Sequence, residues 1–342
     1  MRTYREATDL LLGATATANV NWTASDELDP PYYGEYGSPT PVGTNLYTLD
    51  AVAYESILVG LLSLITGKHT GGHPVGREGE QDAVFVAFSR DGFHWWRPLP
   101  SFDGLRTPFL PMSAAKADWN FQNVQSAGGG FLTLEDELRF FVGGRSGTCE
   151  GIQPPRPHCS YNGNATTGFA SLRRDGFASL LAFGPAQTSA SSLTTRPLSF
   201  NASRIHQISG AAGGSALFLF VNADVSVAHG FVNADVSVAH GCLTVQVVDE
   251  TTREPLARLD ASTPLCAINS MRARVDFPRA AGGGDLAPLA HKPFRLRFTL
   301  TGKGSRLYSF WVGTKACGES RGYVAAGSSS FNRTTDVYGL CT

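Results

Sequence analysis

Six cysteines give this chain of 342 residues an even set of thiols, and the chemistry that such a set favours is oxidation to disulfide bonds. Cys149 and Cys159 are the closest in sequence and flank a proline-rich loop, so proximity favours their pairing. Spacing alone leaves the other connectivities open. The cysteines stand at positions 149, 159, 242, 266, 317 and 341.

Four N-x-S/T sequons accompany the cysteines, where composition predicts roughly two by chance. Together they indicate a secreted glycoprotein that folds in an oxidising compartment, the alternative being coincidence and free thiols. Charges are scattered through the first 22 residues, unlike a signal peptide, so we expect an extracellular or secretory-pathway protein whose signal lies outside this sequence. The sequons are at Asn21, Asn164, Asn201 and Asn332.

Neither metal nor charged-polymer binding is predicted. His69 and His73 have ligand-like spacing, but Gly71-Gly72 and Pro74 make the segment a loop, so we expect no metal and no cofactor. The 28 basic residues nearly equal the 29 acidic residues in number, and no block of like charge occurs. We therefore expect neither a nucleic-acid nor a membrane partner. The longest apolar stretch, 56–66, is about half a membrane span and is interpreted as a buried strand.

The elements that must position any site are strands. Apolar runs of four to eight residues, rich in Val, Phe, Leu and Thr and bounded by Gly, Pro, Asn or Asp, recur along the whole chain. No stretch sustains helical apolar spacing over three turns. The chain is therefore predicted to be all-β, with enough apolar residues for two domains.

The tetrapeptide Arg-Asp-Gly-Phe occurs twice, at 90–93 and 174–177. The first copy predicts a hairpin in which 84–88 is a strand, Asp-Gly supplies the turn and 93–97 returns. The second copy is expected to have the same layout, and 15–23 looks like a degenerate third member. Repeated strand-turn-strand units suggest the blades of a propeller, although Asp-Gly turns are common in any β protein.

The segment 89–95, SRDGFHW, resembles the S-x-D-G-x-x-W blade turn of the five-bladed propellers that include glycoside hydrolase families 32 and 43. The order of further motifs is similar to a mostly uncharacterised group related to those hydrolases, over some 300 residues. These motifs are DELDPP (26–31), LYT (46–48), VAY (52–54), DWN (118–120), LRFFVGG (138–144), GFASLRRDGF (168–177), LTTRPL (193–198), LFVN (219–222), GCLTV (241–245) and RLYSF (306–310).

The resemblance implies glycoside hydrolysis by carboxylates gathered in a pocket over the propeller channel. One carboxylate would protonate the leaving oxygen and another would act as nucleophile or activate water. The acids near matched motifs are Asp29, Glu55 and Asp118. Each has an alternative: Asp29 shapes a turn before two prolines, Glu55 is a solvated residue at a strand start, and Asp118 caps a short helix.

Aromatic residues near those acids would stack on the C–H faces of a sugar. The expected platform is Tyr47, Tyr54 and Trp119, with Arg145 clamping a hydroxyl or carboxylate, and core packing is the alternative. Relatives tend to have Trp-Asp where this chain has Trp119-Asn120, which puts the third acidic position in question.

These expectations combine into a partial five-bladed propeller over 1–190 and a β-sandwich over 193–342, with carbohydrate as partner. Relatives begin well before the 26–31 motif, so the first blades are expected to be missing. A catalytically silent carbohydrate-binding or cell-surface protein is the alternative to an enzyme.

The 11-residue segment FVNADVSVAHG occurs in tandem at 220–230 and 231–241, and its odd length predicts that the extra copy leaves the strand.

Overall fold

The structure, a computed structural model, describes most of the chain. The described residues are 2–4, 20–23, 25–33, 43–67, 81–100, 104–115, 117–121, 123–146, 165–183, 190–200, 216–226, 241–280, 284–324 and 335–337. Strands dominate among these residues, which also include the 3₁₀ helix η2 (Ala287–Leu289), so the predicted all-β class is confirmed. Within these residues, no helix has the length and apolarity to cross a bilayer.

The chain folds as two compact units. The first unit comprises 1–172 with 323–334, and the second comprises 173–322 with 335–342. The division therefore follows residue 172, and the segment that continues to position 190 belongs to the second unit.

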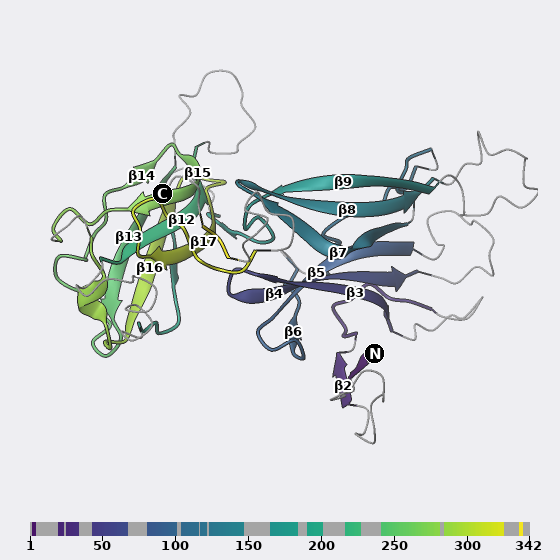
Figure 1. The fold of residues 1–342 in the computed structure, drawn as a ribbon, viewed down its shortest axis with the longest axis horizontal. Helices are drawn as coiled ribbons and strands as arrows, with labels where there is room; N and C mark the ends of the chain where they lie inside the picture. Colours follow the sequence, from purple (N-terminus) through teal and green to yellow (C-terminus); the bar gives the residue numbers. More distant parts are fainter. Residues whose placement is uncertain are drawn as a thin grey trace, which may run out of the picture. The chain divides into compact units, whose positions relative to one another are not determined.

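The first unit is built from antiparallel meanders (Figure 1). One four-stranded sheet has the order β3-β4-β5-β6, and a three-stranded sheet has the order β7-β8-β9. A short pair, β1 with β2, precedes them. The strands are β1 (Arg2–Tyr4), β2 (Val20–Thr23), β3 (Asn45–Tyr54), β4 (Ile57–Thr66), β5 (Gln81–Ser89), β6 (Trp95–Trp96), β7 (Val124–Leu134), β8 (Glu137–Arg145) and β9 (Ala165–Arg173).

Apolar side chains of these two sheets pack together where β3 meets β7. The rings of Tyr54 and Phe131 meet edge-on, with their centroids 5.3 Å apart. The ring centroids of Phe131 and Phe140 are 5.0 Å apart. A Cβ built on Gly130 would lie 2.9 Å from the side chain of Val52, so the glycine permits this approach. β4 is buried along most of its length, as the apolar run predicted.

The first Arg-Asp-Gly-Phe copy forms the predicted hairpin, in which Phe88 pairs with Trp96 and Ser89 with Trp95. Ser89 Oγ accepts from the backbone N–H of Gly92 at 2.9 Å, while Asp91 Oδ1 accepts from the N–H groups of Phe93 and His94 at 2.8 Å each. Gly92 adopts φ 81°, which suits glycine. These contacts explain why Ser, Asp and Gly occur at this spacing.

The second copy differs from this expectation. Its left-handed residue is Asp175 (φ 59°), and no serine occupies the position equivalent to Ser89, where Arg173 stands. The strand that follows, β10 (Leu180–Leu181), pairs with β17 (Arg306–Gly313) in another sheet. The prediction of a second equivalent hairpin was wrong because long-range pairing of β10 determines its path.

The second unit contains two four-stranded antiparallel sheets, β10-β17-β12-β15 and β11-β16-β13-β14 (Figure 1). Both sheets contribute to one hydrophobic core, with Leu219 and Leu307 from one and Val245 and Phe298 from the other. The remaining strands are β11 (Ser191–Thr194), β12 (Phe218–Asp224), β13 (Cys242–Asp249), β14 (Leu265–Cys266), β15 (Asn269–Val275) and β16 (Phe294–Thr301).

A disulfide joins Cys242 and Cys266, which pair across β13 and β14, and Cys317 is also disulfide-bonded. Such bonds form in oxidising compartments, which fits the expected extracellular location. Cys149 and Cys159 lie outside the described residues, as do three sequons and the histidines at 69 and 73. The first FVNADVSVAHG copy enters β12, whereas 227–240 also lie outside them.

Candidate functional site

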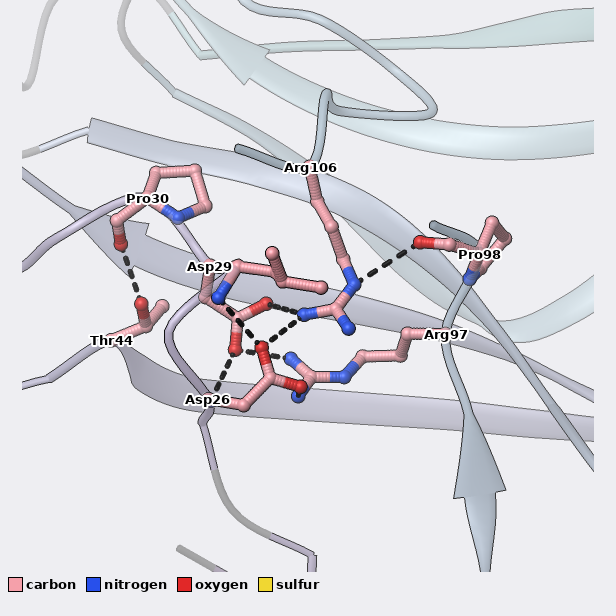
Figure 2. Close-up of polar contacts among 8 residues, drawn as sticks. Asp26, Asp29, Pro30, Thr44, Arg97, Pro98 and Arg106 are labelled. Atoms are coloured by element: carbon pink, nitrogen blue, oxygen red, sulfur yellow. Dashed lines mark hydrogen bonds and ion pairs between the residues drawn. The ribbon is translucent and has the colours of Figure 1, made fainter. Parts of the chain in front are cut away.

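Asp29 lies in a buried cluster of two acids and two arginines (Figure 2). Its Oδ2 accepts from Arg97 Nη1 at 2.5 Å and from the backbone N–H of Asp26 at 2.9 Å, and its Oδ1 accepts from Arg106 Nη1 at 2.9 Å. The Asp29 side chain is 0% exposed. Both carboxylate oxygens of Asp29 accept hydrogen bonds, and the side chain is shielded from solvent. The carboxylate is therefore suited to stabilise the fold rather than to transfer a proton.

Asp26 completes the cluster from its rim, with its side chain 45% exposed. It receives hydrogen bonds from Arg106 at 2.5 Å and Arg97 at 3.0 Å. The hydrogen bond from Arg106 is the main cause that holds the pKa of Asp26 below its ordinary value. Burial acts to lower the pKa of Arg106, but the hydrogen bonds to Asp26 and Asp29 outweigh it and raise that pKa. The cluster thus contains two carboxylates and two guanidinium groups, and each carboxylate forms an ion pair with both arginines.

Glu55 occupies the turn between β3 and β4 and is partly exposed. Its backbone has φ 51°, a left-handed conformation that is uncommon for glutamate. The Glu55 N–H donates to the carbonyl of Tyr323 at 2.6 Å, and the Tyr323 N–H donates back at 2.9 Å. This pairing places Tyr323, whose side chain is exposed, beside Glu55. The sequence analysis did not identify Tyr323 as a candidate site residue.

Asp118 and Trp119 lie on a compact loop between Pro111 and Phe121. Ser113 Oγ donates to Asp118, and the Ser113 N–H donates to the carbonyl of Asn120 at 3.0 Å. The Asn120 side-chain amide donates to the carbonyl of Pro111 at 3.0 Å. These bonds fix the loop that presents Trp119, and the expected helix cap at Asp118 is instead a turn.

Trp119 is 42% exposed yet firmly supported. A Cβ built on Gly144 of β8 would lie 2.5 Å from the indole and 2.7 Å from the Trp119 carbonyl oxygen. The indole therefore rests directly on glycine backbone, in space that no other residue type would leave. The six-membered ring of the indole is thereby held by β8, while part of the side chain remains exposed to solvent. Asp118 and Asn120 flank it in sequence.

The other expected sugar contacts do not join Trp119 in one group. Tyr54 is 3% exposed and belongs to the core, whereas Tyr47 is 49% exposed and sits at a bulge near the start of β3. The two tyrosines are seven positions apart along β3, which corresponds to about 23 Å. Arg145 is exposed, but strand alternation directs it to the face opposite Gly144 and hence away from Trp119.

The candidate acids lie on different segments of the first unit. Asp118 is next to Trp119, which packs on Gly144, while Glu55 follows Tyr54, which packs on Phe131 opposite Phe140. Gly144 and Phe140 are four residues apart on β8, or about 13 Å. The described residues also hold no cluster of three or more His, Cys, Asp or Glu side chains suited to a metal ion.

The best-defined candidate site is therefore the Trp119 loop, with the Glu55 turn as a second location.

Comparisons with protein-family models and with curated proteins found no match for this chain.

Proposed function

We propose that the protein binds carbohydrate through the Trp119 loop. The observation that carries this proposal is the exposed indole, held against Gly144 by a loop whose hydrogen bonds are satisfied internally. Sugars stack their C–H faces on such rings and bond their hydroxyls to carboxylate and amide groups. Asp118 and Asn120 flank Trp119 in sequence, and the bonds that fix the loop do not use the Oδ1 atom of either residue, so these two oxygens are the proposed partners of sugar hydroxyls.

The proposal includes a fold assignment. We infer that the two meanders of the first unit are blades of a five-bladed propeller like those of glycoside hydrolase families 32 and 43. The second unit would be the accompanying β-sandwich. In support, β3-β4-β5-β6 is a four-stranded meander with the SRDGFHW turn at its outer hairpin, and two sheets of the second unit share one core.

Binding is tested with a panel of immobilised oligosaccharides and then by calorimetry on the strongest ligand. Trp119→Ala should weaken binding by roughly 30-fold, corresponding to about 2 kcal/mol, because the stacking platform is removed. Gly144→Ala should weaken binding too, since its Cβ displaces the indole without contacting sugar. Trp96→Ala is the matched control, since Trp96 is 57% exposed but stacks on Phe88. Equal losses for Trp96→Ala and Trp119→Ala would contradict the assignment.

Glycoside hydrolysis is the second candidate, and the backbone pairing of the partly exposed Glu55 with Tyr323 favours it. The left-handed φ of Glu55 itself belongs to the two-residue turn between Tyr54 and Ile57. The exposed Tyr323 ring beside it offers a stacking surface for a sugar. Asp29 is left out of this proposal because its oxygens are engaged by arginines.

Hydrolysis is checked by incubating the protein with chromogenic glycosides. If Glu55 transfers a proton, Glu55→Gln should lower turnover by about 100-fold or more while binding persists. Asp50→Asn on β3, the strand that leads into the Glu55 turn, serves as a control for the loss of one carboxylate. Turnover unaffected by Glu55→Gln, or no turnover by the unaltered protein, would leave carbohydrate binding as the function.

A further inference from the structure

A cavity of about 180 Å³ lies within the second unit and is distinct from the carbohydrate site proposed in the first. Its apolar walls are formed by Phe200, Leu217 and Val312. Its polar rim comes from the loop that follows β17, including Glu319 and Arg321. An apolar pocket with a few convergent polar groups is the usual form of a small-molecule site.

The size of the cavity limits the ligand to a single ring. An apolar protein cavity of about 150 Å³ holds benzene, and pockets for drug-sized molecules start near 300 Å³. The cavity of this chain lies between these values. The ring of Phe200 provides a face on which a flat ligand can pack.

Glu319 lines this cavity, and one of its carboxylate oxygens is an unused hydrogen-bond acceptor. Its side chain is 1% exposed, and among the described residues its Oε2 has no hydrogen-bond partner. Oε1 accepts from Arg321 Nε at 2.8 Å, and Lys315 Nζ lies 3.7 Å from the same atom. A buried acceptor without a partner is unfavourable, and the terminal torsion of glutamate is soft enough to direct this oxygen to a ligand.

The charge at the rim favours a neutral ligand. Lys315 and Arg321 already offset the single negative charge of Glu319, so an ammonium group would add a third cation to one carboxylate. A hydroxyl group donates one hydrogen bond and brings no charge. The expected ligand therefore carries a hydroxyl rather than an amine.

Hydrogen bonds hold the backbone on both sides of Glu319 in place. The carbonyl of Gly318 accepts from Arg272 Nη1 and from the indole N–H of Trp311, at 3.1 Å each. The N–H of Ser320 donates to Asp336 at 2.9 Å. A pre-formed pocket loses little entropy on binding, which favours a specific ligand.

We propose that this cavity binds a small neutral molecule with one apolar ring and a hydroxyl group, which donates to Oε2 of Glu319. The ring would occupy the space between Phe200, Leu217 and Val312, and the hydroxyl would satisfy the buried carboxylate oxygen.

Phenol and toluene test this proposal because they have the same number of non-hydrogen atoms and differ by the hydroxyl. In a titration of the full chain followed by NMR, phenol should bind about 10- to 100-fold more tightly than toluene, the range expected for a hydrogen bond to a charged group. Intermolecular contacts from phenol should reach Phe200 and Val312. Val312→Phe should abolish binding by filling the cavity, and Glu319→Gln should reduce the preference for phenol.

Several results would overturn the proposal. These are equal affinities for phenol and toluene, binding of neither, or phenol contacts away from Phe200. Tighter binding of benzylammonium than of phenol would show that the site takes cations. The comparison of ligands on the unaltered protein decides the matter even if Val312→Phe fails to fold.

Discussion

Asp29→Ala should destabilise the first unit by about 3–5 kcal/mol, because it removes the only fully buried carboxylate of the cluster and leaves the buried Arg97 and Arg106 with the half-exposed Asp26 alone. The side chains of these arginines are only 6% and 8% exposed, so water cannot replace the lost partner. The measurement is hydrogen exchange of the full chain, read by mass spectrometry on peptides from each unit at increasing urea.

Asp26→Ala is the matched control for this experiment. Its side chain is 45% exposed, and Asp29 still pairs with both arginines after its removal, so we expect a loss of about 1 kcal/mol. Similar losses for the two substitutions would show that the buried cluster does not stabilise the fold as described. Loss of protection in second-unit peptides would contradict the division into two units.

Phe298→Ala should destabilise the second unit by a similar amount, about 3–5 kcal/mol. Phe298 is fully buried in the shared core, where its ring lies 5.0 Å from that of Phe310. Truncation removes apolar contacts from both sheets and leaves a cavity. The same exchange experiment should show faster exchange in peptides of β13 and β16 and unchanged exchange in β4 and β5.

Phe183→Ala provides the comparison, because Phe183 belongs to the same unit but is 70% exposed. We expect its effect to remain within about 0.5 kcal/mol, as for most surface substitutions. A Phe298→Ala protein as stable as the Phe183→Ala protein would contradict a core shared by the two sheets.

Local sequence was sufficient to predict the strands and the first hairpin. The hydrogen bonds of this turn join Ser89 to Asp91 and Gly92, which are only two and three residues away. The spacing of these residues is therefore enough to predict the turn. The second copy of the turn could not be predicted in the same way. Asp175 accepts a hydrogen bond from Ser309, 134 residues away, and nothing near the turn in sequence indicates this partner.

The candidate site was predictable only in part, for a similar reason. Trp119 was identified from its motif, but its support by Gly144 depends on a contact between a loop and a strand. Asp29 was identified as a candidate acid, whereas its arginine partners lie 68 and 77 residues further along the chain. Glu319 was not singled out because its burial and its unused oxygen arise from packing.

The order in which the strands pair has a consequence for synthesis on the ribosome. In the first unit, β3 to β6 pair with their neighbours in sequence, so each strand of this meander finds its partner soon after it is made. In the second unit, Leu180 pairs with Leu307 and Leu193 with Phe298. Strands β10 and β11 must therefore wait for more than 100 residues of further translation before their partners exist. A nascent chain can thus complete the sheets β3-β4-β5-β6 and β7-β8-β9 early, whereas β10 and β11 stay without their partners until β16 and β17 emerge.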